Sequence, residues 1–175
     1  MRLLIYIVVG VIGGLILLAG IVALIGSRLP KSHVASRSIH LRKSPQEVYA
    51  VVRDFGSAPK WRSDVKQMEV EALPGRPVYF REVGKNGTVN YELVEDIPAQ
   101  RIVTRIRDTD LGYSGQWTYF FAPENGGTRV TIREDGEVSN VIFRFMSRYV
   151  FGQTATIDSY LTSLAKRFGE EAVPQ

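Results

Sequence analysis

Two patterns of apolar residues divide the chain into an N-terminal segment and a larger folded part. From Leu3 to Gly26 no side chain is charged, and most are large and apolar. A helix over this stretch rises about 36 Å, which exceeds the thickness of the hydrocarbon core of a bilayer. The pattern therefore predicts a transmembrane helix within residues 1–28, joined by a linker at 29–33 to a domain that begins at residue 34.

A cleaved signal peptide is the alternative interpretation of this segment. Its apolar region would be about 7 to 15 residues long and would precede a small-residue cleavage site. The apolar run is longer than that, and Ala23-Leu24-Ile25-Gly26 offers a poor cleavage site. The sequence therefore favours a retained, single-pass membrane helix and predicts the lipid bilayer as a partner.

The charges that flank the segment predict which side of the membrane carries the domain. Arg2 is the only basic residue before it. The basic residues that follow it closely are Arg28, Lys31, Arg37, Arg42 and Lys43. Because basic residues are preferentially retained on the cytoplasmic side, we expect a cytoplasmic domain. Gly10 and Gly14 form a G-x-x-x-G pair, which lets two helices approach closely and predicts a weak homodimer.

Beyond the linker the apolar pattern is typical of a mixed α and β domain. A strand is predicted at 34–42, where Ile39 and Leu41 share one face. Ser44, Pro45 and Glu47 then form a capping box with a proline in the first turn, which predicts the start of a helix. The stretch 54–64 predicts a short helix or compact loop around Trp61.

An alternation with period two follows and predicts an antiparallel meander. Six strands are expected, at 65–73, 78–83, 88–95, 102–107, 116–122 and 128–135. Asn86-Gly87 and Asn125-Gly126 accept positive φ and close hairpins. A long final helix is predicted at 138–169, with a weak interior at Gly152 to Thr156 where we expect a bend. The fold class is α+β, with one domain at 34–170 and a short tail at 171–175.

Composition and charge exclude several classes of function. The chain of 175 residues carries a net charge of +4, with 22 basic residues scattered among 18 acidic ones, and this gives no nucleic-acid-binding stripe. The absence of cysteine excludes disulfides and thiolate metal sites. His33 in the linker and His40 on the outer strand face are expected to be solvated. We therefore expect no metal, no cofactor and no histidine-based catalytic triad.

A set of apolar and aromatic side chains is predicted to face the final helix. The candidate cavity-lining residues are Phe80, Tyr91, Ile102, Trp117, Tyr119 and Phe121 on strands, and Tyr149, Ile157 and Tyr160 on the helix. An ordinary filled core is the alternative, although several tyrosine hydroxyls would then need partners. Glu82 shares a face with Phe80 and is a candidate polar anchor, paired with Arg105. Glu134 and Asp135 lie at a strand end. Because adjacent strand residues point to opposite faces, the two cannot act together on one substrate atom, and we assign them to the turn or sheet edge.

The order of elements and several local motifs resemble a known superfamily. The motifs are Ser44-Pro45-Gln46-Glu47-Val48-Tyr49, Asp54-Phe55 with Trp61 after it, and Gly115-Gln116-Trp117-Thr118-Tyr119. Over residues 32–170 the chain resembles the START-like superfamily, also called SRPBCC or Bet v 1-like, which includes polyketide cyclases and lipid transport proteins. The resemblance implies a curved sheet of about seven strands wrapped around a C-terminal helix, with a hydrophobic cavity between them.

The resemblance and the residues together favour binding over catalysis. The leading hypothesis is a membrane-anchored domain that binds a lipid or another hydrophobic small molecule as a carrier, sensor or presenter. A polyketide cyclase or aromatase-like enzyme would use the same pocket, with only Glu82, Arg105 and the tyrosines as candidate groups. A quinone-handling factor and an interaction module with a filled core are the remaining hypotheses.

Overall fold

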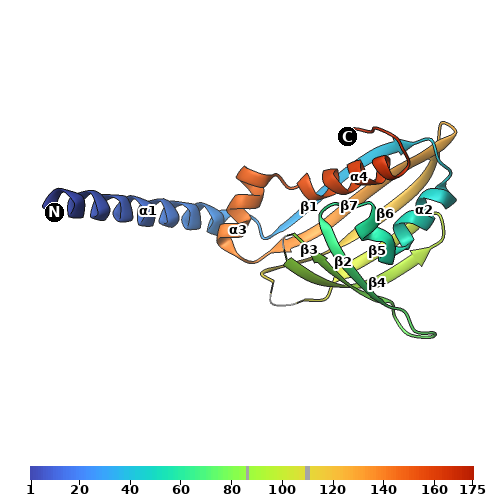
Figure 1. The fold of residues 1–175 in the computed structure, drawn as a ribbon, viewed down its shortest axis with the longest axis horizontal. Helices are drawn as coiled ribbons and strands as arrows, with labels where there is room; N and C mark the ends of the chain where they lie inside the picture. Colours follow the sequence, from blue (N-terminus) through green and yellow to red (C-terminus); the bar gives the residue numbers. More distant parts are fainter. Residues whose placement is uncertain (86, 109–110) are drawn as a thin grey trace.

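The computed structural model describes residues 1–175 except 86 and 109–110 (Figure 1). Its helices are α1 (Arg2–Arg28), α2 (Pro45–Arg53), the 3-10 helix η1 (Phe55–Lys60), α3 (Val141–Met146), the π-helical turn η2 (Ser147–Phe151) and α4 (Ala155–Arg167). Its strands are β1 (Ser32–Leu41), β2 (Val65–Glu71), β3 (Tyr79–Gly84), β4 (Gly87–Ile97), β5 (Arg101–Ile106), β6 (Tyr113–Glu124) and β7 (Gly127–Val138).

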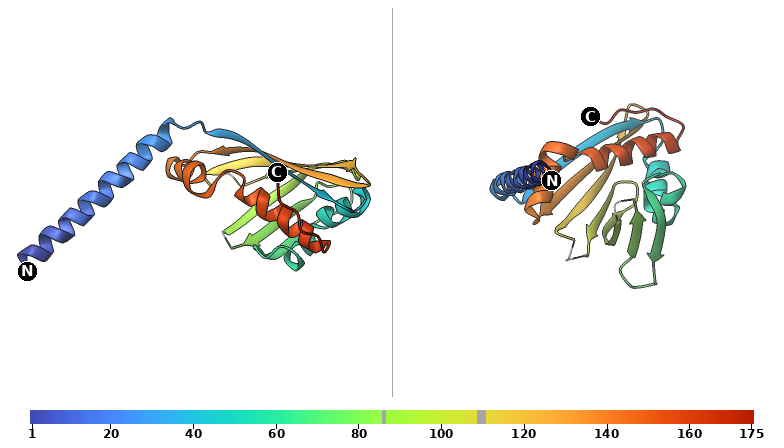
Figure 2. Two further views of the ribbon diagram at one scale, coloured as in Figure 1. Left: turned by 90° about the horizontal axis from the view of Figure 1, so that it is seen from above. Right: turned by 60° about the vertical axis from the view of Figure 1, so that its left-hand side comes forward.

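The strands form one antiparallel sheet in the order β1-β7-β6-β5-β4-β3-β2. β2 to β7 follow one another as a meander, and β1 pairs with β7 along its whole length. The sheet curves around α4, while α1 projects away from the domain (Figures 1 and 2). The predicted α+β class, with a curved sheet around a C-terminal helix, is confirmed.

Local signals in the sequence act as predicted at two turns. The capping box closes at α2: the Ser44 hydroxyl accepts from the Glu47 amide at 3.3 Å, and the Glu47 carboxylate accepts from the Ser44 amide at 2.9 Å. Asn125 and Gly126 turn β6 into β7 with φ of 47° and 75°. In the other predicted hairpin turn Gly87 has φ of 124°, whereas Asn86 lies outside the described residues.

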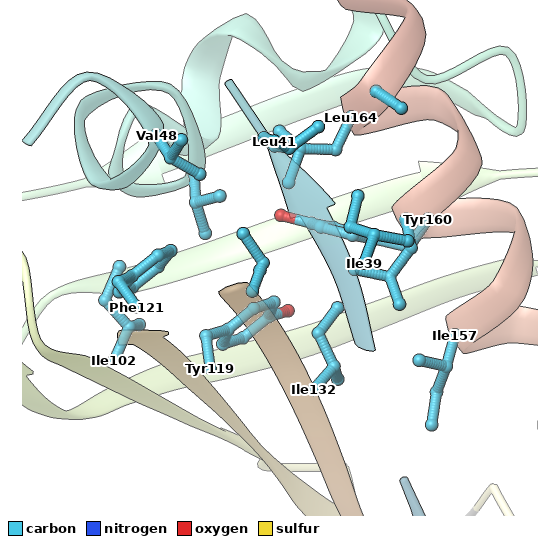
Figure 3. Packing of buried hydrophobic residues seen from close by; sticks show 14 of the residues in the cluster. Ile39, Leu41, Val48, Ile102, Tyr119, Phe121, Ile132, Ile157, Tyr160 and Leu164 are labelled. Carbon is cyan, nitrogen blue, oxygen red and sulfur yellow. The ribbon is translucent and has the colours of Figure 1, made fainter. Parts of the chain in front are cut away.

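The core lies between α4 and the concave face of the sheet. Ile157, Leu161 and Leu164 of α4 are fully buried. They belong to one cluster with Ile39 of β1 and Ile132 of β7, and Figure 3 shows part of this packing. These apolar side chains recur on one side of α4, so burial of that face holds the helix on the sheet.

The prediction of one continuous helix over 138–169 is wrong. α3 and η2 occupy the first part, and Gly152 then adopts φ of 79° and ψ of 148°, which ends helical geometry before α4 begins. A Cβ at Gly152 would meet nothing within 4 Å. The glycine is therefore used for its backbone conformation, which side chains disfavour, and not for a close helix–sheet contact.

The linker and the tail are both attached to the domain. Ser32 and His33 already belong to β1, so only a few residues separate α1 from the sheet. At the other end of the chain, Gln175 exchanges two backbone hydrogen bonds of 3.0 Å with Ser38. The tail thus covers part of the β1 edge, which would otherwise present unpaired backbone groups.

Candidate functional site

The concave face of the sheet has two regions, one fully buried and one only half-buried. Residues that pair across antiparallel strands share a face, and Ile102, Tyr119 and Ile132 form such a row beneath α4, all of them buried. Among the half-buried residues of the same face are Glu82, Val89, Tyr91, Ile106, Tyr113, Trp117 and Glu134. The half-buried part is thus a separate region of the concave face, and we call it the half-buried end.

The half-buried end lies where α1 joins the domain. β1 begins at Ser32, directly after α1, and pairs there with the end of β7. The end of β7 in turn pairs with the start of β6, where Tyr113 lies opposite Val138. α3 follows β7 at the same place (Figure 1). The β1, β7 and β6 part of the half-buried end is therefore close to α1 and α3.

An ion pair between Arg62 and Glu82 lies on the concave face. Arg62 Nη1 donates to Glu82 Oε2 at 2.7 Å, and Arg62 Nη2 donates to Glu82 Oε1 at 3.2 Å and to Asp64 at 2.6 Å. Burial lowers the pKa of Arg62, but attraction to Glu82 and the hydrogen bonds outweigh burial and raise it. The guanidinium therefore stays charged beside apolar side chains.

Two buried donors beside this ion pair have no partner among the described residues. They are Nε of Arg62 and Nε1 of Trp61. A buried donor without an acceptor costs about 1–3 kcal/mol. An acceptor that reached either group would remove that cost.

Aromatic rings surround the ion pair and join α4 to the sheet. The Arg62 guanidinium lies 5.1 Å from the ring centroid of Tyr160, and Trp61, Trp117 and Tyr119 each have a centroid within 6 Å of that ring. Burial raises the pKa of Tyr119 and of Tyr160 far above the ordinary range. Both hydroxyls are therefore neutral groups that can donate and accept hydrogen bonds.

Glu134 is an acidic residue of the half-buried end that the sequence analysis assigned to the strand end. It lies opposite Trp117 on the concave face, and its Oε1 is 3.5 Å from His33 Nε2. Burial raises the pKa of the Glu134 carboxyl, and the charge of His33 opposes this in part. The alternation of Val130 and Ile132 on β7 was the signal that places Glu134 inward.

The two histidines are less exposed than expected. His33 points to the concave face, with Nε2 3.5 Å from Glu134 Oε1. His40 is half-buried, and its Nε2 lies 2.9 Å from the Glu124 carbonyl oxygen. Within residues 1–85, 87–108 and 111–175, no group of three or more histidine, aspartate or glutamate side chains is arranged to hold a metal ion.

The structure brings most of the predicted lining residues together. Phe80, Ile102, Tyr119, Phe121, Ile157 and Tyr160 are buried in the core cluster, and Tyr91 and Trp117 are half-buried against it. Phe80 stacks on Tyr91 with centroids 5.0 Å apart. Their role in binding a ligand stays a prediction.

Tyr149 and Arg105 lie elsewhere, contrary to the sequence analysis. Tyr149 is 59% exposed on η2 and packs on Phe145, because the chain turns at Gly152 and does not continue as one helix along the sheet. Arg105 follows an inward residue on β5, points outward and pairs with Glu92 at 3.3 Å. Glu82 is on the concave face as predicted, but its partner is Arg62.

A hollow lies on the surface away from the half-buried end. It is an open depression of about 380 Å³ lined by Tyr49, Ala50, Arg53, Asp54, Phe55, Gly56 and Val70. Asp96 accepts hydrogen bonds from two of these residues, from the Tyr49 hydroxyl and from Arg53 Nε. Burial and the Asp96 carboxylate raise the pKa of Tyr49 to about 12.

Comparison with known proteins establishes the family. Residues 32–169 match the model of the family described as Polyketide cyclase / dehydrase and lipid transport, and the chain belongs to this family of the START/SRPBCC superfamily. This confirms the resemblance drawn from the sequence. Membership supports a hydrophobic ligand-binding domain. No curated protein matches the chain.

Solved structures share the fold at low sequence identity. A START superfamily protein from Mycobacterium smegmatis has a TM-score of 0.61 and 19% identity, covering 77% of this chain and 96% of that one. Norcoclaurine synthase from Thalictrum flavum has a TM-score of 0.62 and 10% identity over 80% and 88% of the two chains. The di-domain ARO/CYC StfQ from the steffimycin biosynthetic pathway has a TM-score of 0.59 and 14% identity, covering 79% of this chain and 52% of that one. This chain thus spans about half of StfQ.

Proposed function

We propose that this protein is a membrane-anchored domain that binds a lipid or another hydrophobic small molecule at the half-buried end of its concave face. One observation carries the proposal: an apolar, aromatic surface with fixed polar groups lies at the end of the sheet where α1 attaches. Pockets of this composition bind apolar ligands and orient them by a few polar contacts. The domain would receive its ligand from the adjacent leaflet, as a carrier, sensor or presenter.

The contacts of α1 support a retained membrane anchor. α1 is long and apolar enough to span a bilayer, although an N-terminal signal sequence meets the same criterion. Arg144 of α3 is buried and donates to the carbonyl oxygens of Gly26 at 3.1 Å and Leu29 at 2.9 Å. Cleavage near Gly26 would take away part of this network, so the contacts favour retention.

The cytoplasmic side is proposed for the domain on the basis of the flanking basic residues. Protease added to intact cells should then leave the domain uncut. Digestion in intact spheroplasts, with cytoplasmic control proteins protected, would reverse the orientation.

The homodimer through Gly10 and Gly14 is a separate proposal, supported by the open space around both residues on α1.

An enzymatic role in the same place is the second candidate, and Glu134 is the observation that favours it. A carboxyl whose pKa is raised by burial keeps its proton to a higher pH than a solvated carboxyl does, and it could donate that proton to a bound substrate. Two fold relatives carry names of biosynthetic enzymes, an ARO/CYC protein and norcoclaurine synthase. Loss of turnover but not of ligand binding in a Glu134→Gln variant would support this candidate.

Native mass spectrometry of the full chain released from detergent micelles tests the binding proposal. Val89 is half-buried on the concave face opposite Glu82, whereas Val94 on the same strand is exposed. We expect a copurified apolar molecule in the wild type and in Val94→Trp, and its loss in Val89→Trp, whose larger side chain would occupy the half-buried end. Equal ligand content in both variants would contradict this location.

A further inference from the structure

Exposed apolar side chains are concentrated on α3 and η2. Ile142 and Phe143 of α3 are 42% exposed, and Tyr149, Val150 and Phe151 of η2 are 57–59% exposed. We call these residues the α3–η2 patch. Elsewhere in the described domain the exposed large apolar residues stand singly. Single exposed apolar residues are normal, but a contiguous set marks a surface that contacts something apolar.

The α3–η2 patch is held against the end of α1 by buried contacts. Besides Gly26 and Leu29, Arg144 donates to the carbonyl oxygens of Val138 and Ser139, both at 3.0 Å. Gly26 is buried, and a Cβ there would collide with the Val141 carbonyl oxygen. α3 therefore lies directly on the last turn of α1, and η2 packs on α3.

We propose that the α3–η2 patch lies in the interface of the bilayer that α1 crosses, with Tyr149, Val150 and Phe151 inserted at the boundary of headgroups and acyl chains. This inference rests on the proposed membrane anchoring of α1. Aromatic side chains are enriched at this depth, and short apolar surfaces flanked by basic residues bind there. Arg148, next to Tyr149, is an exposed basic residue beside the patch.

The bilayer fits the patch better than a protein partner does. The α3 part of the patch adjoins α1, whose exposed apolar side chains would lie in the same membrane. Arg28, the last residue of α1, and Lys31 after it are exposed basic residues at the end of α1 that α3 contacts, where they would face lipid headgroups. The apolar surfaces of α1 and of the patch would contact the hydrocarbon core, and the basic residues between them would contact anionic lipid headgroups.

Insertion of the patch would bring the half-buried end to the membrane surface. Phe143 of α3 packs near Tyr113 at the start of β6, with centroids 5.9 Å apart. Tyr113 is one of the residues of the half-buried end. An apolar ligand would then pass from the leaflet to the concave face along the α3–η2 patch, with little exposure to water.

The chain contains no cysteine, so single cysteines can report depth in the full-length protein. We would place an environment-sensitive fluorophore at Val150→Cys, at Phe151→Cys, at Ile12→Cys within α1 and at Val94→Cys on the sheet. The protein is reconstituted at one copy per nanodisc in phosphatidylcholine and phosphatidylglycerol, with and without brominated acyl chains. We expect blue-shifted emission and quenching by brominated lipid at Ile12, Val150 and Phe151, and neither at Val94.

The labels separate failure of this inference from failure of the membrane anchor. The inference is overturned, and the anchor stays intact, if the label at Ile12 is quenched while the labels at Val150 and Phe151 emit like the label at Val94. Absence of quenching at Ile12 would overturn both. Protection of Val150 and Phe151 that appears only when several copies share a disc would overturn the inference and assign the patch to a second copy of the chain.

Discussion

The Arg62 guanidinium and the Glu82 carboxylate form a two-point ion pair that joins the segment after η1 to β3. Hydrogen bonds of 2.7 and 3.2 Å fix its geometry, and the Arg62 side chain is only 10% exposed. The guanidinium also lies beneath Tyr160 of α4. One polar contact thus connects the elements that surround the concave face.

Removal of one partner of this ion pair should cost more stability than removal of both. Arg62→Met leaves Glu82 without its counter-charge in a largely buried place, and we expect a loss of about 3–5 kcal/mol. The double variant Arg62→Met with Glu82→Met should recover part of that loss. Denaturant unfolding followed by circular dichroism measures the free energies. If the loss of stability in the double variant equals the sum of the losses in Arg62→Met and Glu82→Met, the two residues do not interact.

Gly26 and Gly20 of α1 offer a matched pair for the junction with α3. An alanine Cβ at Gly26 would collide with the Val141 carbonyl oxygen, whereas a Cβ at Gly20 would meet nothing within 4 Å. We expect Gly26→Ala to cost about 1–3 kcal/mol through overpacking and to loosen α3, which would increase tryptic cleavage after Arg148. Gly20→Ala should leave cleavage unchanged. Equal cleavage of the two variants would contradict the packed junction.

Gly152→Ala should destabilise the protein. Its φ of 79° with ψ of 148° lies in a region that is almost restricted to glycine, where another residue costs about 1–3 kcal/mol. If residues 138–169 formed one helix, alanine would instead stabilise it. A melting temperature below that of a Gln153→Ala control is expected. A higher melting temperature would indicate that the segment is a continuous helix in solution.

Glu134 should make stability depend on pH in a defined direction. Burial raises the pKa of its carboxyl in the folded protein, so between its unfolded and folded pKa values the folded state binds more protons. Wild-type stability should therefore fall as the pH rises through the folded pKa. Unfolding of Glu134→Gln, measured over the same pH series, should lack this component. An unchanged pH profile in the variant would assign the dependence to other groups.

Much of the fold follows from local patterns in the sequence. The capping box at Ser44, the turn at Asn125 and the alternation along β6 and β7 each depend on neighbouring residues, and each appears as expected. The break at Gly152 was predicted only as a bend. Helical spacing of apolar residues continues through α3 and η2, although there those residues face outward.

The site was only partly predictable because it depends on contacts between distant segments. Alternation places Glu82 on the concave face, but its partner Arg62 comes from an irregular segment whose position no periodicity reveals. Arg105 was a plausible partner by charge, yet its own strand turns it outward to Glu92. His33 and Glu134 meet across β1 and β7, so their contact requires the strand register.

The central claim, that an apolar ligand binds on the concave face, is tested most directly by quenching of Trp117. The chain has two tryptophans, so Trp61→Phe leaves Trp117 as the only indole in the full-length protein. We expect saturable quenching by a dibrominated fatty acid, reversed by excess of the unbrominated acid. The control carries Phe120→Trp, on the exposed outer face, in a chain without Trp61 and Trp117. Quenching of Trp117 that is not saturable, or no stronger than that of the control, would contradict binding at the concave face.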